Sequence, residues 1–443
     1  MRTPRGDHRT DIVDRTGGVD VIDGLDWELI AARYWDRRPV LIRLADAPER
    51  HPFRPDDVFA SAVAATAANA AGEIPKHVRF AVDRDLKSRP DGWLPRAGDG
   101  SLDGYAHRLA ERLAGRRYSL TVQAFHAFHP ALWRRERAFY DGAFRRFGLP
   151  LSSAITTMFH GNYEHTQIGA HKDRFASFMF ALQGRKRMRF WPERPWTEAV
   201  TSVLDYERYL PASFAVEVHP GEMLYWPSSY HHVGESALDE TPATSVNVGL
   251  PREFTRSAFE VAEYLTEPTP ESMLSEEMET AGLPPLAGPA WAPADPIDGS
   301  SVMGELPSAL AQAVDFFRSG IDERSLNEWV ATLSLRRWTA GGFFPSPPPA
   351  PHRALDDEAT VTLPVDEPVR WHDTGAARIV AACGHTTRTT LDAHTLTRLL
   401  TALRTSRGGT RTGTLLDRLP TAAREDARHL LEDLSRFHAL HHS

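Results

Sequence analysis

The chain has 443 residues, enough for roughly two to four domains of ordinary size. Its composition, with 41% hydrophobic and 25% charged residues, is typical of globular proteins and excludes a fibrous or disordered chain. The formal net charge of −8 argues against a general nucleic-acid binder. A single cysteine, Cys383, excludes an intramolecular disulfide and any zinc or iron–sulfur site that needs several thiolates.

The N-terminal stretch MRTPRGDHRTDIVDRTGG lacks the apolar segment of a secretion signal. No run of about eighteen apolar residues, as a membrane-spanning helix requires, occurs in the sequence. Together with the lone thiol, which suits a reducing compartment, these features lead us to expect a cytoplasmic protein with no membrane partner.

The first part of the chain predicts a mixed, helix-rich segment after a polar tail. An amphipathic helix begins at Asp26, and an apolar run from Val40 to Leu44 predicts a strand. Further helices are expected over the Ala-rich stretch that ends near Gly72, over residues 102–115 and over residues 131–146, with a strand at YSLTVQAF between the last two.

The middle of the chain, from about Ala154 to Leu250, is rich in short β-prone runs. These runs are AITTMFH, SFMFALQG, KRMRFW, FAVEVHPGEMLYWP and TSVNVGL. Many short strands at such spacing, separated by turns, predict a β-barrel or β-sandwich.

The last part of the chain alternates helices with Pro-rich stretches. Residues 252–280 and 305–338 predict helices, and FFPSPPPAP at 343–351 predicts an extended linker and a domain boundary. Beyond it, short strands precede a helix with leucines at helical spacing and two further helices. This order is similar to a winged-helix module, and it fits a plain packing or dimerisation module equally well.

Three side chains in the β-rich region have the chemistry of a metal site. His171 and Asp173 would project to the same side of an extended chain, whereas an HxD triplet alone also occurs by chance on wet surfaces. His231 and His232 are adjacent, so only one of them should point the same way. Two histidines and one carboxylate form the facial triad of non-heme Fe(II) oxygenases.

Lys186 lies 13 residues after Asp173 and opens the strand that follows the hairpin turn QGRK. On that strand Lys186, Met188 and Phe190 share one face, and the neighbouring arginines share the other. A lysine among apolar neighbours requires an anion, which a carboxylate of 2-oxoglutarate would supply. The alternative is an exposed lysine in a basic hairpin.

With these motifs in place, residues 20 to 255 resemble the JmjC and cupin-type Fe(II)- and 2-oxoglutarate-dependent oxygenases, especially the bacterial ribosomal oxygenases and the asparaginyl hydroxylase that inhibits hypoxia-inducible factor. The matching features are HxD, the lysine at the same spacing, and a histidine five residues after Pro227. The resemblance implies an α+β protein with a mainly β core, a double-stranded β-helix. It also implies that Fe(II) is held by His171, Asp173 and His232, and that dioxygen takes an open metal position.

The resemblance also implies residues for the co-substrate, 2-oxoglutarate. Lys186 would pair with it, Asn247 matches an asparagine of the family's last core strand, and Tyr118 matches a tyrosine that bonds its carboxylate. Two departures alter these contacts: Ser177 replaces an asparagine, and Ile168 replaces a threonine three residues before the first histidine.

The expected organisation is a cap at 1–115, an oxygenase core at 116–255, a helical region at 256–342 that would allow a homodimer, and a winged-helix-like domain at 352–443. The expected function is hydroxylation of a side chain in a protein or peptide, with nucleic acid not the substrate. Two alternatives stay open: a hydroxylase of a small metabolite or free amino acid, and a non-catalytic metal-binding cupin with a regulatory role.

Overall fold

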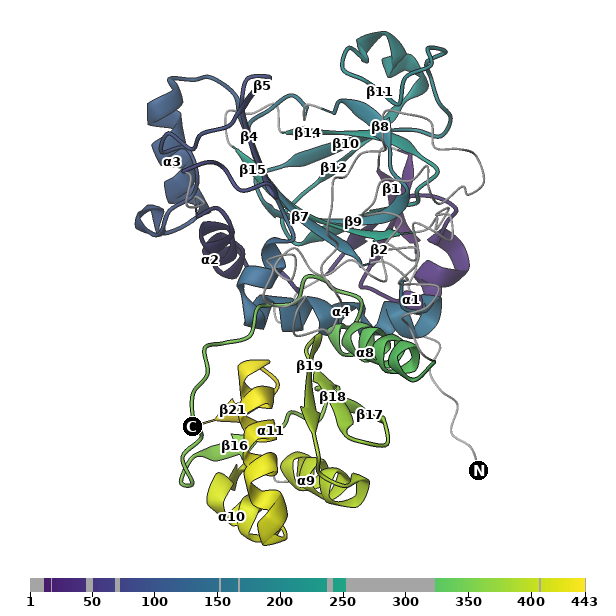
Figure 1. The fold of residues 1–443 in the computed structure, drawn as a ribbon. Coiled ribbons are helices and arrows are strands. Elements are labelled where there is room, and N and C mark those ends of the chain that lie inside the picture. The colour runs from purple at the N-terminus through teal and green to yellow at the C-terminus, as the bar shows by residue number, and fades with distance from the viewer. Residues whose placement is uncertain are drawn as a thin grey trace, which may run out of the picture.

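The structure is a computed structural model in which two β-sheets, a layer of helices and a C-terminal module are stacked (Figure 1). The described residues are 12–16, 18–44, 51–67, 72–150, 153–165, 168–236, 242–251, 323–405 and 408–442. The helices expected at 252–280, and the first part of the one expected at 305–338, lie outside these residues. No helix in the described part of the chain is long and apolar enough to cross a membrane.

The larger sheet has ten strands and runs through the centre of the molecule. In spatial order its strands are β1 (Ile12–Thr16), β2 (Val19–Asp23), β3 (Val40–Arg43), β13 (Glu222–Trp226), β9 (Phe175–Gln183), β15 (Ala243–Pro251), β7 (Ile155–Gly161), β6 (Tyr118–Gln123), β4 (Val78–Val82) and β5 (Asp85–Lys87). All neighbours are antiparallel except β2 and β3.

The smaller sheet has five strands and faces the larger one. Its spatial order is β11 (Ser202–Val203), β8 (Ala170–Lys172), β14 (His231–Ser236), β10 (Lys186–Trp191) and β12 (Phe214–Val218). A buried apolar cluster joins Met179, Leu224 and Trp226 of the larger sheet to Met188 and Phe190 of the smaller one. The expected barrel or sandwich is therefore present, and its interior lies between these two faces.

The strands of the two sheets interleave along the chain. From β7 to β15, strands β7, β9, β13 and β15 join the larger sheet, and β8, β10, β11, β12 and β14 join the smaller one. Residues near the metal-ligand candidates therefore come from segments far apart in sequence.

The N-terminal segment differs from the expected polar tail and helix-rich cap. Strands β1 and β2 extend the larger sheet, and β4 and β5 extend its other edge. Val21 and Ile22 are fully buried on opposite faces of β2, the first toward the smaller sheet and the second toward the helices. A strand that is buried on both faces lacks simple polar–apolar alternation, which is why the sequence does not reveal it.

Helices cover the other face of the larger sheet. They are α1 (Trp27–Leu29, continued by a π-helical turn Ile30–Tyr34), α2 (Pro55–Ala65), α3 (Leu102–Leu113) and α4 (Pro130–Phe147). Helix α8 (Glu323–Ala340) lies between this layer and the C-terminal module, which it contacts (Figure 1). In α4, Tyr140 packs its ring 5.6 Å from that of Phe178 in β9. The fully buried Glu136 accepts hydrogen bonds from Thr156 of β7 (2.5 Å) and His126 (2.8 Å), which ties α4 to the sheet.

Helix α4 begins and ends where its sequence dictates. The His129 side chain accepts a hydrogen bond from the backbone N–H of Leu132, and Pro130 occupies the first turn, where no intrahelical N–H bond is lost. Gly148 follows the last turn with φ of +83°, a conformation that stops the helix.

The C-terminal module contains two small sheets and three helices. Its elements are β16 (Thr360–Thr362), β17 (Arg370–Asp373), β18 (Arg378–Ala382), β19 (His385–Thr389), α9 (Ala393–Thr405), β20 (Thr410–Arg411), α10 (Thr412–Asp417), α11 (Arg424–Arg436) and β21 (His441–His442). The sheets are β20-β16-β21 and β17-β18-β19. The leucines expected at helical spacing are all buried in α9.

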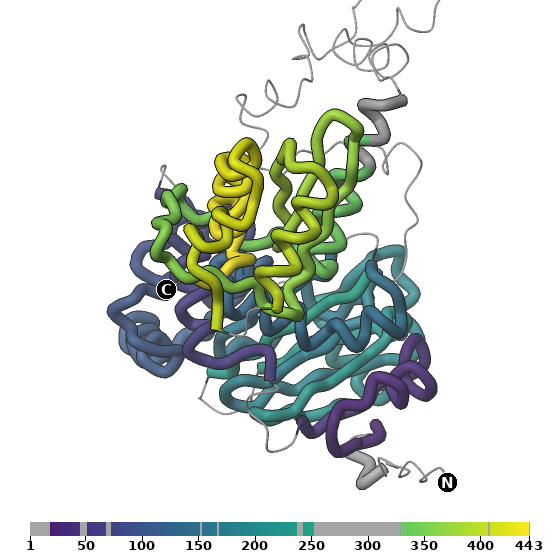
Figure 2. Tube along the Cα trace, turned by 90° about the horizontal axis from the view of Figure 1, so that it is seen from below, coloured from purple at the N-terminus to yellow at the C-terminus, as the bar shows by residue number. Residues whose placement is uncertain are grey.

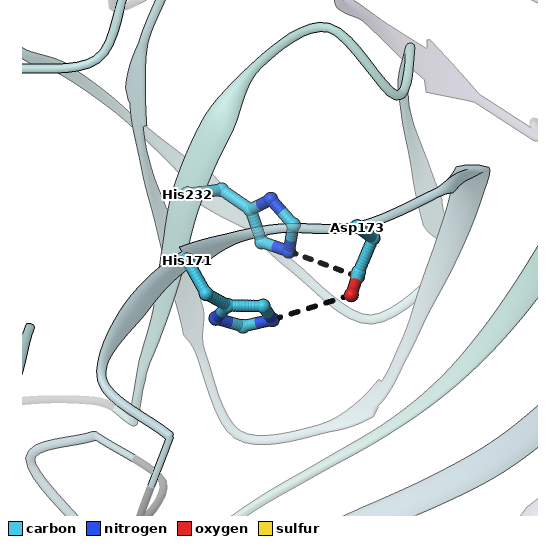
Figure 3. A group of neighbouring side chains, drawn as sticks. All are labelled: His171, Asp173 and His232. Carbon is cyan, nitrogen blue, oxygen red and sulfur yellow. Dashed lines mark ion pairs between the residues drawn. The ribbon is translucent and has the colours of Figure 1, made fainter. Parts of the chain in front are cut away.

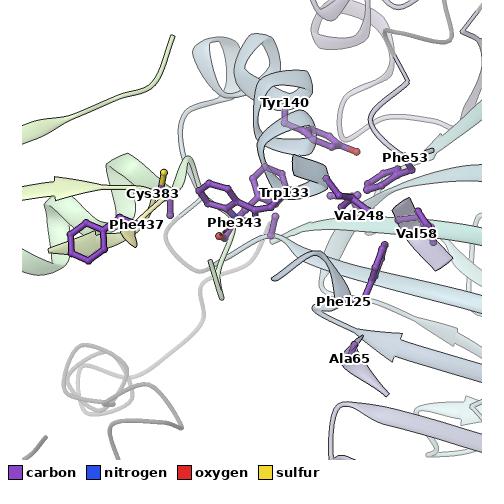
Figure 4. Close-up of a cluster of buried hydrophobic side chains, with 14 of the residues drawn as sticks. Phe53, Val58, Ala65, Phe125, Trp133, Tyr140, Val248, Phe343, Cys383 and Phe437 are labelled. Atoms are coloured by element: carbon purple, nitrogen blue, oxygen red, sulfur yellow. Dashed lines mark hydrogen bonds between the residues drawn. The ribbon is translucent and has the colours of Figure 1, made fainter. Parts of the chain in front are cut away.

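The Pro-rich stretch at 343–351 has no helix or strand, as expected, but it is packed against the protein. The Phe343 ring is fully buried 5.5 Å from that of Tyr140, and the Trp133 indole donates to its carbonyl (3.0 Å). One apolar cluster continues from Val248 of the sheet through α4 to Phe437 of the module (Figure 4). The module lies over the helical layer, as the view from below also shows (Figure 2).

Candidate metal centre

The three expected metal ligands converge at one end of the space between the sheets. His171 is in β8, His232 is directly opposite it in β14, and Asp173 follows the last residue of β8. Directly opposed residues of antiparallel strands project from the same face, which places the two imidazole rings 4.6 Å apart (Figure 3). Asp173 is two residues after His171, so its side chain projects to the same side and lies close to both rings.

The donor atoms of these residues are close enough to share one ion. His171 Nε2 lies 3.5 Å from Asp173 Oδ1, and His232 Nε2 lies 3.4 Å from Asp173 Oδ2. One donor atom from each residue falls within 4.8 Å of the others. With metal–ligand bonds of about 2.0–2.2 Å, such spacing fits one ion with positions open for other ligands.

Backbone carbonyls orient both imidazoles. The Nδ1 of His171 donates to the carbonyl of Gly169 (2.9 Å), and the Nδ1 of His232 to that of Tyr230 (3.3 Å). Because each Nδ1 carries the proton, each Nε2 keeps its lone pair and points at Asp173.

The protonation states also suit metal binding. Burial lowers the pKa of His171, and the charge of His232 adds to this effect. Burial alone would raise the pKa of Asp173, but its interactions with His232 and His171 lower it below its usual range. A neutral imidazole and an ionised carboxylate are the forms that bind a metal ion.

His231, the alternative ligand, points away from this site. It is opposite Lys172 in the β8–β14 pair, and its ring packs edge-on against Trp196 at 5.0 Å. Burial lowers its pKa to about 4.

Lys186 is buried deep between the sheets, at 3% exposure. Its Nζ lies 5.8 Å from the Phe159 ring of the larger sheet and donates a hydrogen bond to the Tyr163 hydroxyl. Among the described residues, no carboxylate lies within ion-pair distance of it. Burial lowers its pKa to about 7. An exposed hairpin lysine is thus excluded, and Arg187 and Arg189 share the opposite face, where both pair with Glu235.

The register of β10 gives the separation of Lys186 from the metal end. Phe190 is directly opposite His232, and Lys186 is opposite Ser236. Four residues of strand correspond to roughly 13 Å between the two positions. Lys186 and the two histidines therefore lie at opposite ends of the inner face of the smaller sheet.

Asn247 and Ser177 lie on the facing side of the larger sheet. Asn247 is opposite Met179, and Ser177 is opposite Trp226, both of which belong to the cluster between the sheets. In the described structure the Oδ1 of Asn247, the Oγ of Ser245 and the Nε1 of Trp226 are buried without hydrogen-bond partners. Buried polar atoms are normally satisfied, so these atoms fit a ligand with polar ends between the sheets.

Tyr118 is placed on the other face of the sheet. Its ring packs 6.1 Å from that of Phe80 in the cluster beneath the helices, and its hydroxyl shares a 2.9 Å hydrogen bond with Nε2 of His160. The structure therefore does not bring Tyr118 to the inner face on which Lys186 lies. The tyrosine beside Lys186 is Tyr163. No motif in the loop sequence GNYEHT identifies it as a functional residue.

One curated protein and several solved structures are similar to this chain. A scan against protein-family models gives no match. The ribosomal protein uL16 3-hydroxylase of Escherichia coli (strain K12) is 24% identical over 230 residues, which are 51% of this chain and 53% of that protein. The match thus spans about half the length of this curated relative.

Among the similar solved structures are those of the E. coli ribosomal oxygenase YcfD. One X-ray structure has a TM-score of 0.46 with 17% identity, and its complex with cobalt and 2-oxoglutarate has a TM-score of 0.45 with 16% identity. Both alignments cover 95% of this chain and 98% of the other. The curated relative is a hydroxylase of a ribosomal protein, in agreement with the resemblance found in the sequence.

Proposed function

We propose that this protein is an Fe(II)- and 2-oxoglutarate-dependent oxygenase that hydroxylates a side chain of a protein or peptide. The observation that carries the proposal is the convergence of His171, Asp173 and His232, with a buried Lys186 on the same inner face. Two neutral imidazoles and a carboxylate suit Fe(II) and leave positions for further ligands. The bound iron would supply the activation of dioxygen and the oxidation of the co-substrate.

The chain's own residues would orient 2-oxoglutarate between the sheets. One carboxylate would lie at the metal end, and the other would reach Lys186, whose ammonium lacks an anionic partner among the described residues. Tyr163, whose hydroxyl already contacts Lys186, would donate to the same carboxylate. Asn247 and Ser177, on the facing side of the larger sheet, would contact the ligand between these two ends. The apolar walls formed by Met179, Met188 and Phe190 would exclude water.

We further propose that the two interleaved sheets form a double-stranded β-helix and that the chain is divided into the four segments expected from the sequence, except that strands β1 to β5 of the first segment belong to the larger sheet. The C-terminal module would be a winged-helix variant used for packing. In support, Asp426 and Asp433 of α11 accept hydrogen bonds from Thr389 and Thr387 of β19, so that side of the helix faces protein.

The proposed substrate is a ribosomal protein, by analogy with the uL16 hydroxylase. A chain that devotes a complete module to packing beyond the metal site suits a large partner better than an enclosed metabolite. A homodimer through the region 256–342 is part of the proposal, since the resemblance implies it. A metabolite hydroxylase and a metal-binding regulatory cupin are the alternatives to test.

The test combines binding and turnover on the full chain. Anaerobic protein should bind Fe(II) and then 2-oxoglutarate, and ribosomal proteins incubated with the complex in air should gain one oxygen atom by mass spectrometry, with one succinate per modification. Free amino acids should gain none. Binding of metal without any 2-oxoglutarate decarboxylation, across ribosomal proteins and metabolites, would favour the regulatory cupin.

A further inference from the structure

We infer that the indole N–H of Trp226 is a positioning donor for the co-substrate, which it would bind through an oxygen of the carboxylate at the metal end. The inference rests on the proposed function, because it assumes that 2-oxoglutarate occupies the space between the sheets. It concerns a residue for which the sequence motifs gave no role.

The indole nitrogen of Trp226 has no hydrogen-bond acceptor among the described residues. Its side chain is 1% exposed, and its Nε1 is shielded from water without an acceptor in the described structure. The other two buried tryptophans of this region differ: Trp191 donates to the carbonyl of Tyr209 (2.9 Å), and Trp196 donates to that of Val200 (3.1 Å). An unsatisfied buried N–H destabilises a protein, so its retention indicates an acceptor in the functional state.

The position of Trp226 identifies the metal end as the place of that acceptor. Its ring lies 5.2 Å from the ring of His232 and 5.7 Å from that of Phe190, which is directly opposite His232. On the other side of Trp226, β9 contributes Ser177, directly opposite it. The indole therefore borders both the ligand His232 and the polar path along the larger sheet.

The chemistry of the site indicates which group accepts the hydrogen bond from Trp226. Trp offers only a donor, so its partner must be an oxygen or another acceptor. The distal carboxylate of the co-substrate is assigned to Lys186 at the other end of the inner face. The carboxylate near the metal is the anionic acceptor that remains, and a hydrogen bond to a charged oxygen is stronger than one to a neutral group.

The test is the affinity for 2-oxoglutarate of the full chain loaded with Mn(II), measured by calorimetry, which needs no turnover. Trp226→Phe keeps the aromatic packing and removes the N–H, and we expect it to weaken 2-oxoglutarate binding by about 10- to 100-fold with unchanged Mn(II) affinity. Trp191→Phe, a matched change on the opposite face of β10, should change the affinity less than about threefold.

A further measurement uses the unsubstituted side chain, so that it does not depend on the folding of a variant. In protein labelled with ¹⁵N-tryptophan and loaded with Zn(II), 2-oxoglutarate should move one indole N–H resonance downfield, and that resonance should be missing in Trp226→Phe or, if this variant does not fold, in Trp226→Tyr. Equal affinities in Trp226→Phe and Trp191→Phe, or no such shift, would overturn the inference. Failure of the unmodified protein to bind 2-oxoglutarate would overturn the proposed function instead.

Discussion

The choice between His231 and His232 is decided by which face of β14 each residue occupies. Substituting His171 or His232 by Ala removes a donor atom from the group within 4.8 Å, whereas His231→Ala removes a ring packed on Trp196. Loss of an outer-shell partner already weakens metal binding by about 10- to 100-fold, so loss of a ligand should weaken Fe(II) or Mn(II) binding by more than about 100-fold.

Calorimetric titration with Mn(II) measures this difference, and His231→Ala is the control that should keep its affinity within about threefold. The assignment is wrong if His231→Ala loses the metal and His232→Ala retains it.

Lys186 makes the affinity for 2-oxoglutarate depend on pH. Burial lowers its pKa to about 7, so in the free protein the side chain is mostly neutral above that pH, and binding a carboxylate then requires proton uptake. Affinity should be nearly constant below about pH 7 and fall by about tenfold per pH unit above it. Calorimetry from pH 6 to pH 9 tests this, and Lys186→Arg, which stays charged, should remove the dependence.

The lowered pKa of Lys186 also makes the free energy of unfolding depend on pH. Between the folded value of about 7 and the ordinary value of 10.5, the unfolded chain holds a proton that the folded chain has lost. The free energy of unfolding of the ligand-free protein should therefore gain a favourable contribution as pH rises through this window. Lys186→Met should abolish that contribution and raise the melting temperature at pH 7, because it removes the cost of burying a charge.

At the scale of single residues, the sequence predicts the position of a site residue where the spacing along a strand determines the side to which its side chain projects. His171 and Asp173 are separated by one residue, so strand periodicity was enough to expect these two on one side. Lys186 lies in β10, two strands further along the chain, and its place beside the site was expected from the resemblance. Tyr163 and Trp226 could not be found this way. Tyr163 lies in an irregular loop, and Trp226 resembles any other core aromatic residue until its N–H is seen to lack an acceptor.

At the scale of elements, the turn before β8 depends on Gly169. Its φ is +68°, its carbonyl orients His171, and a side chain there would collide with the backbone of Val203 in β11. Gly221 has a similar φ of +89° but open space around it. Substitution by Ala at either position should reduce the free energy of unfolding by about 1–2 kcal/mol, because of the strain of this conformation. For Gly169→Ala the collision with Val203 should reduce it by at least about 2 kcal/mol more.

Urea unfolding and Mn(II) titration of the two variants check this expectation. Gly169→Ala should also weaken metal binding, since displacement of the turn moves His171, whereas Gly221→Ala should not. Equal stability and equal metal affinity in the two variants would contradict the role given to the turn.

Most strands and helices could be expected from sequence periodicity, and shortness is a second reason, beside burial on both faces as in β2, why the remaining strands could not. Strands β9, β10, β13 and β15 are long enough for an apolar pattern to appear, and α3 and α4 have clear amphipathic spacing. By contrast, β8 and β11 have three and two residues, too few for any period, and their existence depends on pairing with β14 and with each other. Tertiary contacts rather than local propensity create such strands.

At the scale of the whole molecule, a buried ion pair joins the C-terminal module to the helical layer. Arg137 of α4 donates to both carboxylate oxygens of Glu367 (3.0 and 2.6 Å), and their side chains are 12% and 3% exposed. Glu367→Ala would leave the Arg137 charge buried without its partner and should reduce the free energy of unfolding by about 3–5 kcal/mol.

Calorimetric unfolding and limited proteolysis at residues 343–351 measure this effect, since loosening of the module should expose that stretch. Glu358, whose ion pair with Arg411 has a carboxylate side chain 74% exposed, is the control: Glu358→Ala should change stability by no more than about 1 kcal/mol. If Glu367→Ala unfolds like the parent protein, the ion pair does not hold the module. Removing residues 352–443 is a harsher change, because Phe343 and α8 would lose the surface that covers them.

The shortness of β8 has a consequence for motion in solution. A strand of three residues at the margin of a sheet, followed only by the two-residue β11, has few hydrogen bonds to resist opening, so its amides should exchange with solvent far faster than those of the nine-residue β9. A metal ion bound by His171 and His232 would cross-link β8 to β14. Hydrogen exchange should then slow selectively at residues 170–172 and 202–203 when metal is added, so that the ion completes the folding of the edge that carries its own ligands.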